Sequence, residues 1–160
     1  MPTTRNSLND NARKTAIAAL NARLADTIDL ALAIKHAHWN VRGPQFIAVH
    51  EMLDSLRTEV DDHVDTMAER ISQLAGRPQG TLQGVAAATA LPAYPADAEV
   101  IEAHLTALAD RFAAVANAVR ANIDEVANAG DATSADVFTQ VSRGLDKALW
   151  FIEAHLPANE

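Results

Sequence analysis

Four side chains able to bind a metal ion lie along one apolar-patterned segment, residues 45–75. They form two pairs with a spacing of four residues: His50 with Asp54, and Asp65 with Glu69. In a helix this spacing places both members of a pair on one side, one turn apart. Mixed imidazole and carboxylate ligands suit Fe(II), with zinc or manganese as competitors. The pairs are therefore candidate parts of a metal site.

A plainer interpretation stays open at this point. Residues beside an apolar stripe are often solvated charges at the edge of a buried face, and Asp65 and Glu69 also have Arg70 as a nearby partner. His38 lies on the apolar face of the preceding segment, where a lone buried histidine is usually satisfied by its neighbours. Because His38 accompanies the two pairs of candidate ligands, the five residues together favour a metal site.

The distance between the two pairs predicts how such a site must be built. Asp54 and Asp65 are eleven residues apart, which is three helical turns or about 16 Å, whereas the ligands of one metal ion lie about 2 Å from it. One chain cannot close this gap. If two copies of the helix pack antiparallel about a two-fold axis near residues 59–60, Asp54 meets the partner's Asp65 and two equivalent sites form.

The positions of proline and glycine indicate which elements carry these residues. Long proline-free runs with apolar residues every three or four positions predict four long helices. The expected boundaries are 8–41 capped by Ser7 or Asn9, 44–75 with Pro44 in the first turn and Gly76 as the stop, 97–129, and a last helix to 156 capped by Thr133 or Ser134. The connection 77–95 has room for one short helix over 82–91. We therefore expect an all-α, ferritin-like four-helix bundle with one long crossover between helices two and three.

Composition agrees with this architecture and excludes other classes. The 160 residues suit one domain with short tails at 1–7 and 157–160, and 34 alanines with only 4% aromatic residues are typical of close-packed helices. Without cysteine, a metal must be held by histidine and carboxylate. No run approaches roughly 18 unbroken apolar residues and the first residues have no secretory pattern, so we expect a cytoplasmic protein without a membrane segment. The net charge of −8 favours cations over polyanions.

One long segment resembles a known family. Lys35 to Gly76 reads KHAHWNVRGPQFIAVHEMLDSLRTEVDDHVDTMAERISQLAG, which is similar to the signature of the Dps miniferritins, the DNA-binding proteins from starved cells. The resemblance continues through LPAYP and SRGLDKALWFIEAHL and covers Thr4 to Leu156. It implies a hollow homododecamer that oxidises Fe(II) to Fe(III), preferentially with hydrogen peroxide, and stores the ferric mineral. Such a shell protects DNA and the cell from oxidative damage.

The resemblance also implies which residues bind iron at the two-fold interfaces. The motif HWN supplies His38, HEMLD supplies His50 and Asp54, and DTMAER supplies Asp65 and Glu69. The spacing of the residues supports the last four independently, whereas only the family supports His38 specifically. The Glu-x-x-His motif of a di-iron site inside one bundle does not occur. We therefore expect no intrasubunit centre.

Other residues have two interpretations each. In the resembling family the indole of Trp39 intercepts oxidising equivalents near the iron, with core packing as the alternative. Asp131 and Asp136 are expected either to line an acidic three-fold pore that attracts Fe(II) or to cap the last helix. Trp150 is expected in the core or an interface. The other histidines are expected to be ordinary surface or core residues: His36, His63, His104 and His155.

The rival function is that of a nucleoid-associated, DNA-binding module. DNA binding depends on Lys and Arg, but only Arg5 precedes the first helix, followed by Arg13 and Lys14, and the chain ends in Pro-Ala-Asn-Glu. Twelve copies at −8 carry 12 × −8, about −96, which repels a polyanion. Direct DNA binding is thus disfavoured, although Mg²⁺ bridges or protonated histidines would weaken the repulsion. A scaffold shell with a decayed centre conflicts with the intact ligand set.

Overall fold

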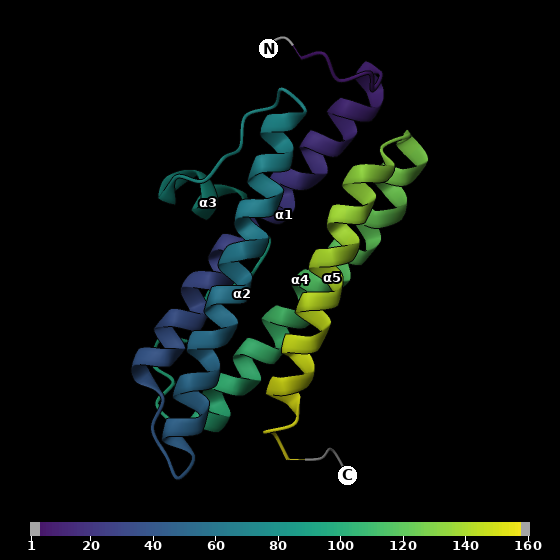
Figure 1. The fold of residues 1–160 in the computed structure, drawn as a ribbon. Helices are drawn as coiled ribbons and strands as arrows, with labels where there is room; N and C mark the ends of the chain where they lie inside the picture. Colours follow the sequence, from purple (N-terminus) through teal and green to yellow (C-terminus); the bar gives the residue numbers. More distant parts are fainter. Residues whose placement is uncertain (1–3, 158–160) are drawn as a thin grey trace.

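A computed structural model of the chain describes residues 4–157; the outer parts of both expected tails, 1–3 and 158–160, lie outside the described residues. Two antiparallel helix pairs, α1 with α2 and α4 with α5, pack side by side, and α3 lies on the crossover outside the bundle (Figure 1). The crossover returns the chain along the bundle, so α4 runs in the direction of α2. The expected all-α, ferritin-like bundle is confirmed. The helices are α1 (Asp10–Asn40), α2 (Phe46–Gln73), α3 (Leu82–Ala88), α4 (Ile101–Ala129) and α5 (Ala132–Glu153).

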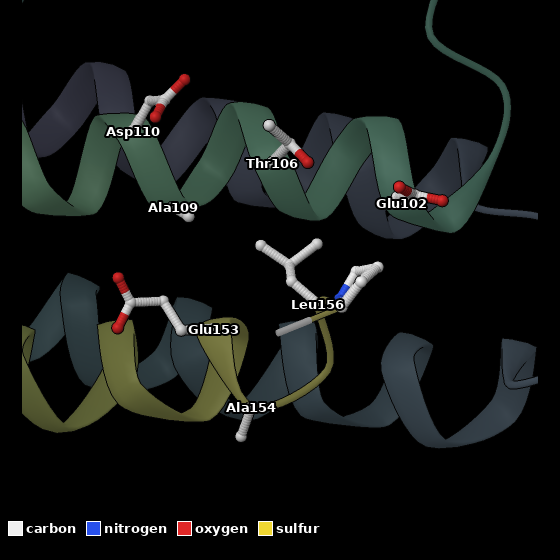
Figure 2. Close-up of a pocket in the computed structure, with 8 residues that line it drawn as sticks. Glu102, Thr106, Ala109, Asp110, Glu153, Ala154 and Leu156 are labelled. Atoms are coloured by element: carbon white, nitrogen blue, oxygen red, sulfur yellow. The ribbon is translucent and has the colours of Figure 1, made fainter. Parts of the chain in front are cut away.

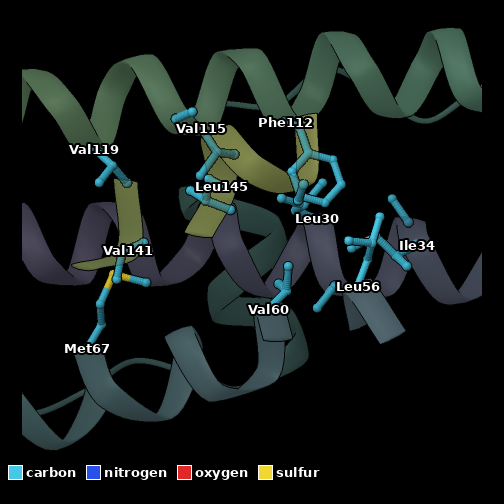
Figure 3. Close-up of a cluster of buried hydrophobic side chains, with 14 of the residues drawn as sticks. Leu30, Ile34, Leu56, Val60, Met67, Phe112, Val115, Val119, Val141 and Leu145 are labelled. Carbon is cyan, nitrogen blue, oxygen red and sulfur yellow. The ribbon is translucent and has the colours of Figure 1, made fainter. Parts of the chain in front are cut away.

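The four long helices are held together by one apolar core. Leu30 of α1, Val60 of α2, Phe112 of α4 and Leu145 of α5 are all fully or almost fully buried and meet in the interior (Figure 3). Buried alanines on α1 let its neighbours approach closely. Burial of these stripes supplies the main free energy of folding. The core leaves one edge of α2 free to carry polar groups.

The first two helices begin and end close to the predicted positions. Asn9 caps α1, because its side chain accepts a hydrogen bond from the backbone N–H of Ala12 at 2.9 Å. The helix α2 begins at Phe46 rather than at Pro44. Pro44 lies instead in a turn closed by a bond from the Phe46 N–H to the Gly43 carbonyl at 3.1 Å. This turn sets the start of α2.

The end of α2 corrects the role predicted for Gly76. The residue with left-handed backbone is Ala75, with φ of 59°. A Cβ on Gly76 would lie 2.8 Å from Ile71 Cγ2 and 2.9 Å from Ile17 Cγ1. Gly76 is therefore needed because α1 and α2 approach closely there, and it does not supply the left-handed conformation.

Hydrogen bonds anchor the crossover to the bundle and determine where the next helices begin. Ala90 donates its N–H to Asp26 Oδ1 at 2.7 Å, which ties the end of the short helix to α1. The helix α3 ends at Ala88, three residues before the predicted boundary. The helix α4 begins at Ile101 rather than at 97, because the Ile101 N–H bonds to the carbonyl of Arg42 at 3.2 Å. The α1–α2 loop thus fixes the start of α4.

The cap of α5 is Asp131, one of the two roles that the sequence left open for this residue, and neither Thr133 nor Ser134. Gly130 ends α4 with φ of 102°, and Asp131 follows directly, accepting a bond from the Ser134 N–H at 3.0 Å. The last helix therefore begins earlier than predicted, at Ala132. The prediction chose Thr133 or Ser134 because Ser and Thr are common N-caps, as Asp is. Across residues 4–157, none of the helices is both long and apolar enough to span a bilayer.

Candidate metal centre

All five predicted iron ligands lie on the α1–α2 pair. His38 is in the last turn of α1 and is 7% exposed. The other four lie on α2, where His50 is half-buried and Asp54, Asp65 and Glu69 are exposed. The histidines therefore sit at the edge of the core, while the carboxylates face outward.

His38 and His50 form a closely packed pair that fixes both rings. Nδ1 of each ring bonds to the backbone carbonyl of the other residue, both at 2.9 Å. The rings stack with centroids 3.7 Å apart and 22° between their planes. Because a carbonyl only accepts, each Nδ1 carries a proton, and in the neutral ring Nε2 then keeps its lone pair. The neutral form of both rings thus presents Nε2 as the nitrogen that can bind a metal ion.

Asp54 lies beside this pair and already has a cationic partner. The ammonium of Lys35 bonds to Asp54 Oδ1, and His38 Nδ1 lies 3.8 Å from the same oxygen. The bond from Lys35 is the largest cause that lowers the pKa of Asp54 below its usual value. Asp54 is thus an ionised carboxylate that attracts positive charge.

Lys35 was not recognised in the sequence as part of the site. It precedes His38 by three residues, a spacing that places both on one face of α1. That spacing is the signal that could have identified it. The contact of Lys35 with Asp54 depends on the packing of α1 on α2. The sequence of either helix alone does not predict this packing.

Asp65 and Glu69 lie one turn apart near the other end of α2. Neither forms an ion pair within residues 4–157. Arg70, the partner offered by the plainer interpretation, turns into the core and bonds to Asp131 and Ser134. The exposed face thus holds two carboxylates that this part of the chain does not neutralise.

One chain does not assemble the five ligands. The structure brings His38 and His50 together with Asp54 beside them, and leaves Asp65 and Glu69 further along α2. Among residues 4–157, no group of three or more His, Asp or Glu side chains is placed to hold one ion. The geometry of a single chain therefore gives two separate groups of candidate ligands.

The two tryptophans are both at the surface of the single chain. Trp39, next to His38, is 71% exposed, and Trp150 on α5 is 63% exposed. The core-packing alternative for each residue is therefore wrong. The position of Trp39 beside the histidine pair is compatible with its predicted role near the iron.

The two predicted pore residues differ in position. Asp131 is 1% exposed, accepts two bonds from Arg70 at 2.9 and 3.1 Å, and caps α5. This is the capping role that the sequence left open, and a side chain so enclosed does not line a pore. Asp136 is exposed one turn into α5, so the predicted pore role rests on Asp136.

A second acidic feature lies between α4 and the end of α5. A cleft of about 730 Å³ is bordered by Glu102 and Asp110 on α4 and by Glu153 on α5 (Figure 2). The carboxylates lie on facing helices with Thr106 between the two on α4. Within residues 4–157 these carboxylates do not form a group of three that could hold one metal ion.

Comparisons with known proteins agree with the ferritin-like fold. The family model described as a ferritin-like domain matches residues 17–158. The DNA protection during starvation protein of Agrobacterium fabrum is 56% identical over 153 residues, which is 96% of this chain and 94% of that protein. The structure of Mycobacterium smegmatis Dps is 33% identical with a TM-score of 0.93, covering 98% of this chain and 96% of that one. Dps from Microbacterium arborescens in its high iron form is also 33% identical, with a TM-score of 0.85 and coverage of 96% and 98%.

Proposed function

The chain belongs to the Dps family of ferritin-like proteins, and from this premise we propose that it oxidises Fe(II) at sites shared between two subunits and stores the ferric product. Hydrogen peroxide is the preferred oxidant, and the storage compartment is the interior of a homododecamer. Fe(II) is the substrate and the ferric mineral is the cargo. The similarity to a Dps whose structure is described as its high iron form supports this proposal.

The observation that carries the proposal is the division of ligands along α2. His50 and Asp54 lie near its start beside His38, and Asp65 and Glu69 lie near its end. An antiparallel copy of α2 brings the partner's Asp65 and Glu69 to the histidine pair and makes two equivalent sites. The ligand set then has two imidazoles and three carboxylates, which suits iron.

Each half-site has a distinct task in this scheme. The Nε2 atoms of His38 and His50 bind Fe(II) as neutral ligands, already oriented by the two carbonyl bonds. Asp54 exchanges the Lys35 ammonium for the metal cation. The carboxylates of Asp65 and Glu69 stabilise the additional positive charge that oxidation to Fe(III) creates.

The electron balance explains the advantage of peroxide. Two Fe(II) ions give one electron each, the peroxide O–O bond breaks, and two protons complete two molecules of water. A pair of electrons delivered together avoids the one-electron reduction that releases hydroxyl radical. Iron storage and peroxide removal are therefore one reaction, and DNA is protected without being bound.

Anaerobic oxidation of Fe(II) by added peroxide tests the proposal, at two Fe(II) per site. Wild-type protein is expected to consume one peroxide per two iron. In Asp65→Asn the rapid phase is expected to slow by about 100-fold, the lower range for the loss of one preorganised electrostatic contact in an active site. Asp62→Asn is the matched control, since Asp62 is an exposed aspartate on the same helix outside the ligand set. Equal, slow oxidation in all three proteins would contradict the proposal.

A further inference from the structure

A cluster of three aromatic rings lies on the other side of α1 from the histidine pair. His36 comes from α1, Tyr94 from the crossover and His104 from α4. Tyr94 is the only tyrosine in the chain. The proposed iron oxidation uses none of these residues.

The central contact is a short hydrogen bond between a phenol and an imidazole. The Tyr94 hydroxyl lies 2.7 Å from His104 Nδ1, and His104 is 0% exposed. Burial raises the pKa of Tyr94 to about 12, and burial, followed by the neighbouring His36, lowers the pKa of His104. At neutral pH the phenol thus keeps its proton and the imidazole is neutral. In the neutral tautomer that carries its proton on Nε2, the Tyr94 O–H donates to His104 Nδ1.

His104 has unused hydrogen-bonding capacity in this arrangement. Its Nε2 is buried without a hydrogen-bond partner within residues 4–157, and so is the Nε2 of His36. A buried polar group that lacks a partner costs stability, so it calls for an explanation. The Nδ1 side of His104 is already aligned to receive the proton of Tyr94.

A nearby cation determines how Tyr94 can lose an electron. The guanidinium carbon of Arg111 lies 5.5 Å from the centre of the Tyr94 ring, and the guanidinium also bonds to Asp29 at 2.9 Å. A positive charge over the ring disfavours a second positive charge on it. The electron therefore leaves at lowest cost when the phenol proton leaves with it.

The cluster is also close to the candidate metal centre. The rings of His36 and Tyr94 meet edge to face with centroids 5.3 Å apart. His36 precedes His38 by two residues on α1, which places their Cα atoms about 5 Å apart across the helix. One helix thus separates the tyrosine from the proposed iron ligands.

We propose that Tyr94 and His104 form a one-electron donor that quenches strong one-electron oxidants, such as hydroxyl radical, formed when Fe(II) meets peroxide one ion at a time. Tyr94 gives one electron to the radical, which becomes hydroxide, and the phenol O–H proton moves to His104 Nδ1. The products are a neutral tyrosyl radical and an imidazolium. A later Fe(II) returns the electron and becomes Fe(III), and the proton returns to the phenol oxygen. Only the source of the oxidant rests on the proposed function.

Photochemical oxidation without iron tests the pair itself. Flash-generated tris(bipyridine)ruthenium(III) serves as the oxidant, and the tyrosyl radical is followed by its absorbance and by electron paramagnetic resonance. The signal is expected in wild-type protein and not in Tyr94→Phe, which assigns it to the single tyrosine. In His104→Gln the radical is expected to form about 100-fold more slowly, the lower range for the loss of a positioned proton acceptor.

Two controls protect this test against a simple folding defect. His36→Gln removes a neighbouring ring that lowers the pKa of His104 but keeps the Tyr94–His104 bond, so it should not show the slow radical formation expected of His104→Gln. A slower rate for wild-type protein in heavy water tests the proton transfer without any substitution. Absence of the radical in wild type, or an equal rate in His104→Gln, would overturn the proposal.

A second arm adds Fe(II) and then excess peroxide to the wild-type protein. A tyrosyl signal during iron oxidation supports the proposed role, and rapid iron oxidation without that signal overturns it. If iron is not oxidised at all, the proposed function fails, and the photochemical arm alone decides whether the pair is a one-electron donor.

Discussion

Each histidine of the pair is held by the backbone of the other residue, so neither ring needs a metal to stay oriented. The carbonyl of each residue fixes the proton on Nδ1 of the other ring. An imidazole so fixed loses little conformational freedom when it binds an ion. The sequence predicted His50 as a ligand by its spacing from Asp54, but these carbonyl partners depend on the packing of α1 against α2 and could not be predicted.

Lys35 competes with the metal ion for Asp54. Because its ammonium bonds to this carboxylate, replacing it in Lys35→Gln should strengthen metal binding by up to about fivefold, the upper range for an exposed ion pair. Titration calorimetry with Zn²⁺, which is not oxidised, measures the effect. Lys147→Gln is the control, since Lys147 pairs with Glu59 at 4.0 Å outside the ligand set. Equal affinity in wild type and Lys35→Gln would contradict this competition.

His104 should make stability depend on pH. Its pKa in the folded chain lies below the usual 6.5 because of burial, so as pH falls below 6.5 the unfolded chain binds a proton first. Stability is therefore fully present above pH 6.5 and decreases as pH falls towards the folded-state pKa. Urea unfolding at pH 7.5 and 5.5, at one protein concentration, measures this loss. His104→Gln should lose less stability than wild type, and an equal loss would refute the assignment. Tyr94 and His36 are the titratable groups that face the His104 ring.

At the scale of elements, α2 carries most of the candidate site and its ends are fixed by other helices. Its apolar stripe was plain in the sequence because Val49, Leu53, Leu56 and Val60 recur at helical spacing. Its termini were less predictable. Pro44 lies in a turn and Gly76 fills a close contact, and both roles depend on neighbouring segments.

The close contact at Gly76 can be tested by adding one methyl group. Gly76→Ala forces a Cβ against Ile71 and Ile17 and should destabilise the protein by about 1–3 kcal/mol, the usual cost of overpacking. Gly80→Ala is the control, because its Cβ would meet only Ile28, at 3.8 Å. It should leave the free energy of unfolding equal or slightly higher. Equal effects of both substitutions on urea unfolding would rule out the packing role of Gly76.

Two aspartates near the start of α5 should differ in their effect on stability, because Asp131 is buried and Asp136 is exposed. Asp131→Asn breaks a buried ion pair with Arg70 and should cost about 3–5 kcal/mol of stability. Asp136→Asn should leave stability unchanged within about 0.5 kcal/mol and slow iron uptake if Asp136 lines a pore. Thermal unfolding together with iron uptake measures both. A stable Asp131→Asn protein would show that the pair is not needed.

At the scale of the whole molecule, the fold was predictable because length, alanine content and breaker positions agreed on one bundle topology. The separation of the candidate ligands into two groups along α2 was also predictable, since eleven residues of helix hold Asp54 and Asp65 about 16 Å apart. The Tyr94–His104 bond was not, because it joins the crossover to α4. The net charge of −8 further favours a shell that attracts cations over one that binds DNA.

The most direct test of the shared site is complementation between two inactive variants. His50→Ala and Asp65→Asn chains, each with its own affinity tag, are co-expressed and mixed shells are purified by both tags. A mixed dimer places both defects in one site and leaves the other site intact, so peroxide-driven Fe(II) oxidation should return although each variant alone is inactive. If mixed shells stay as inactive as their parents, the ligands do not come from two chains and the account is wrong.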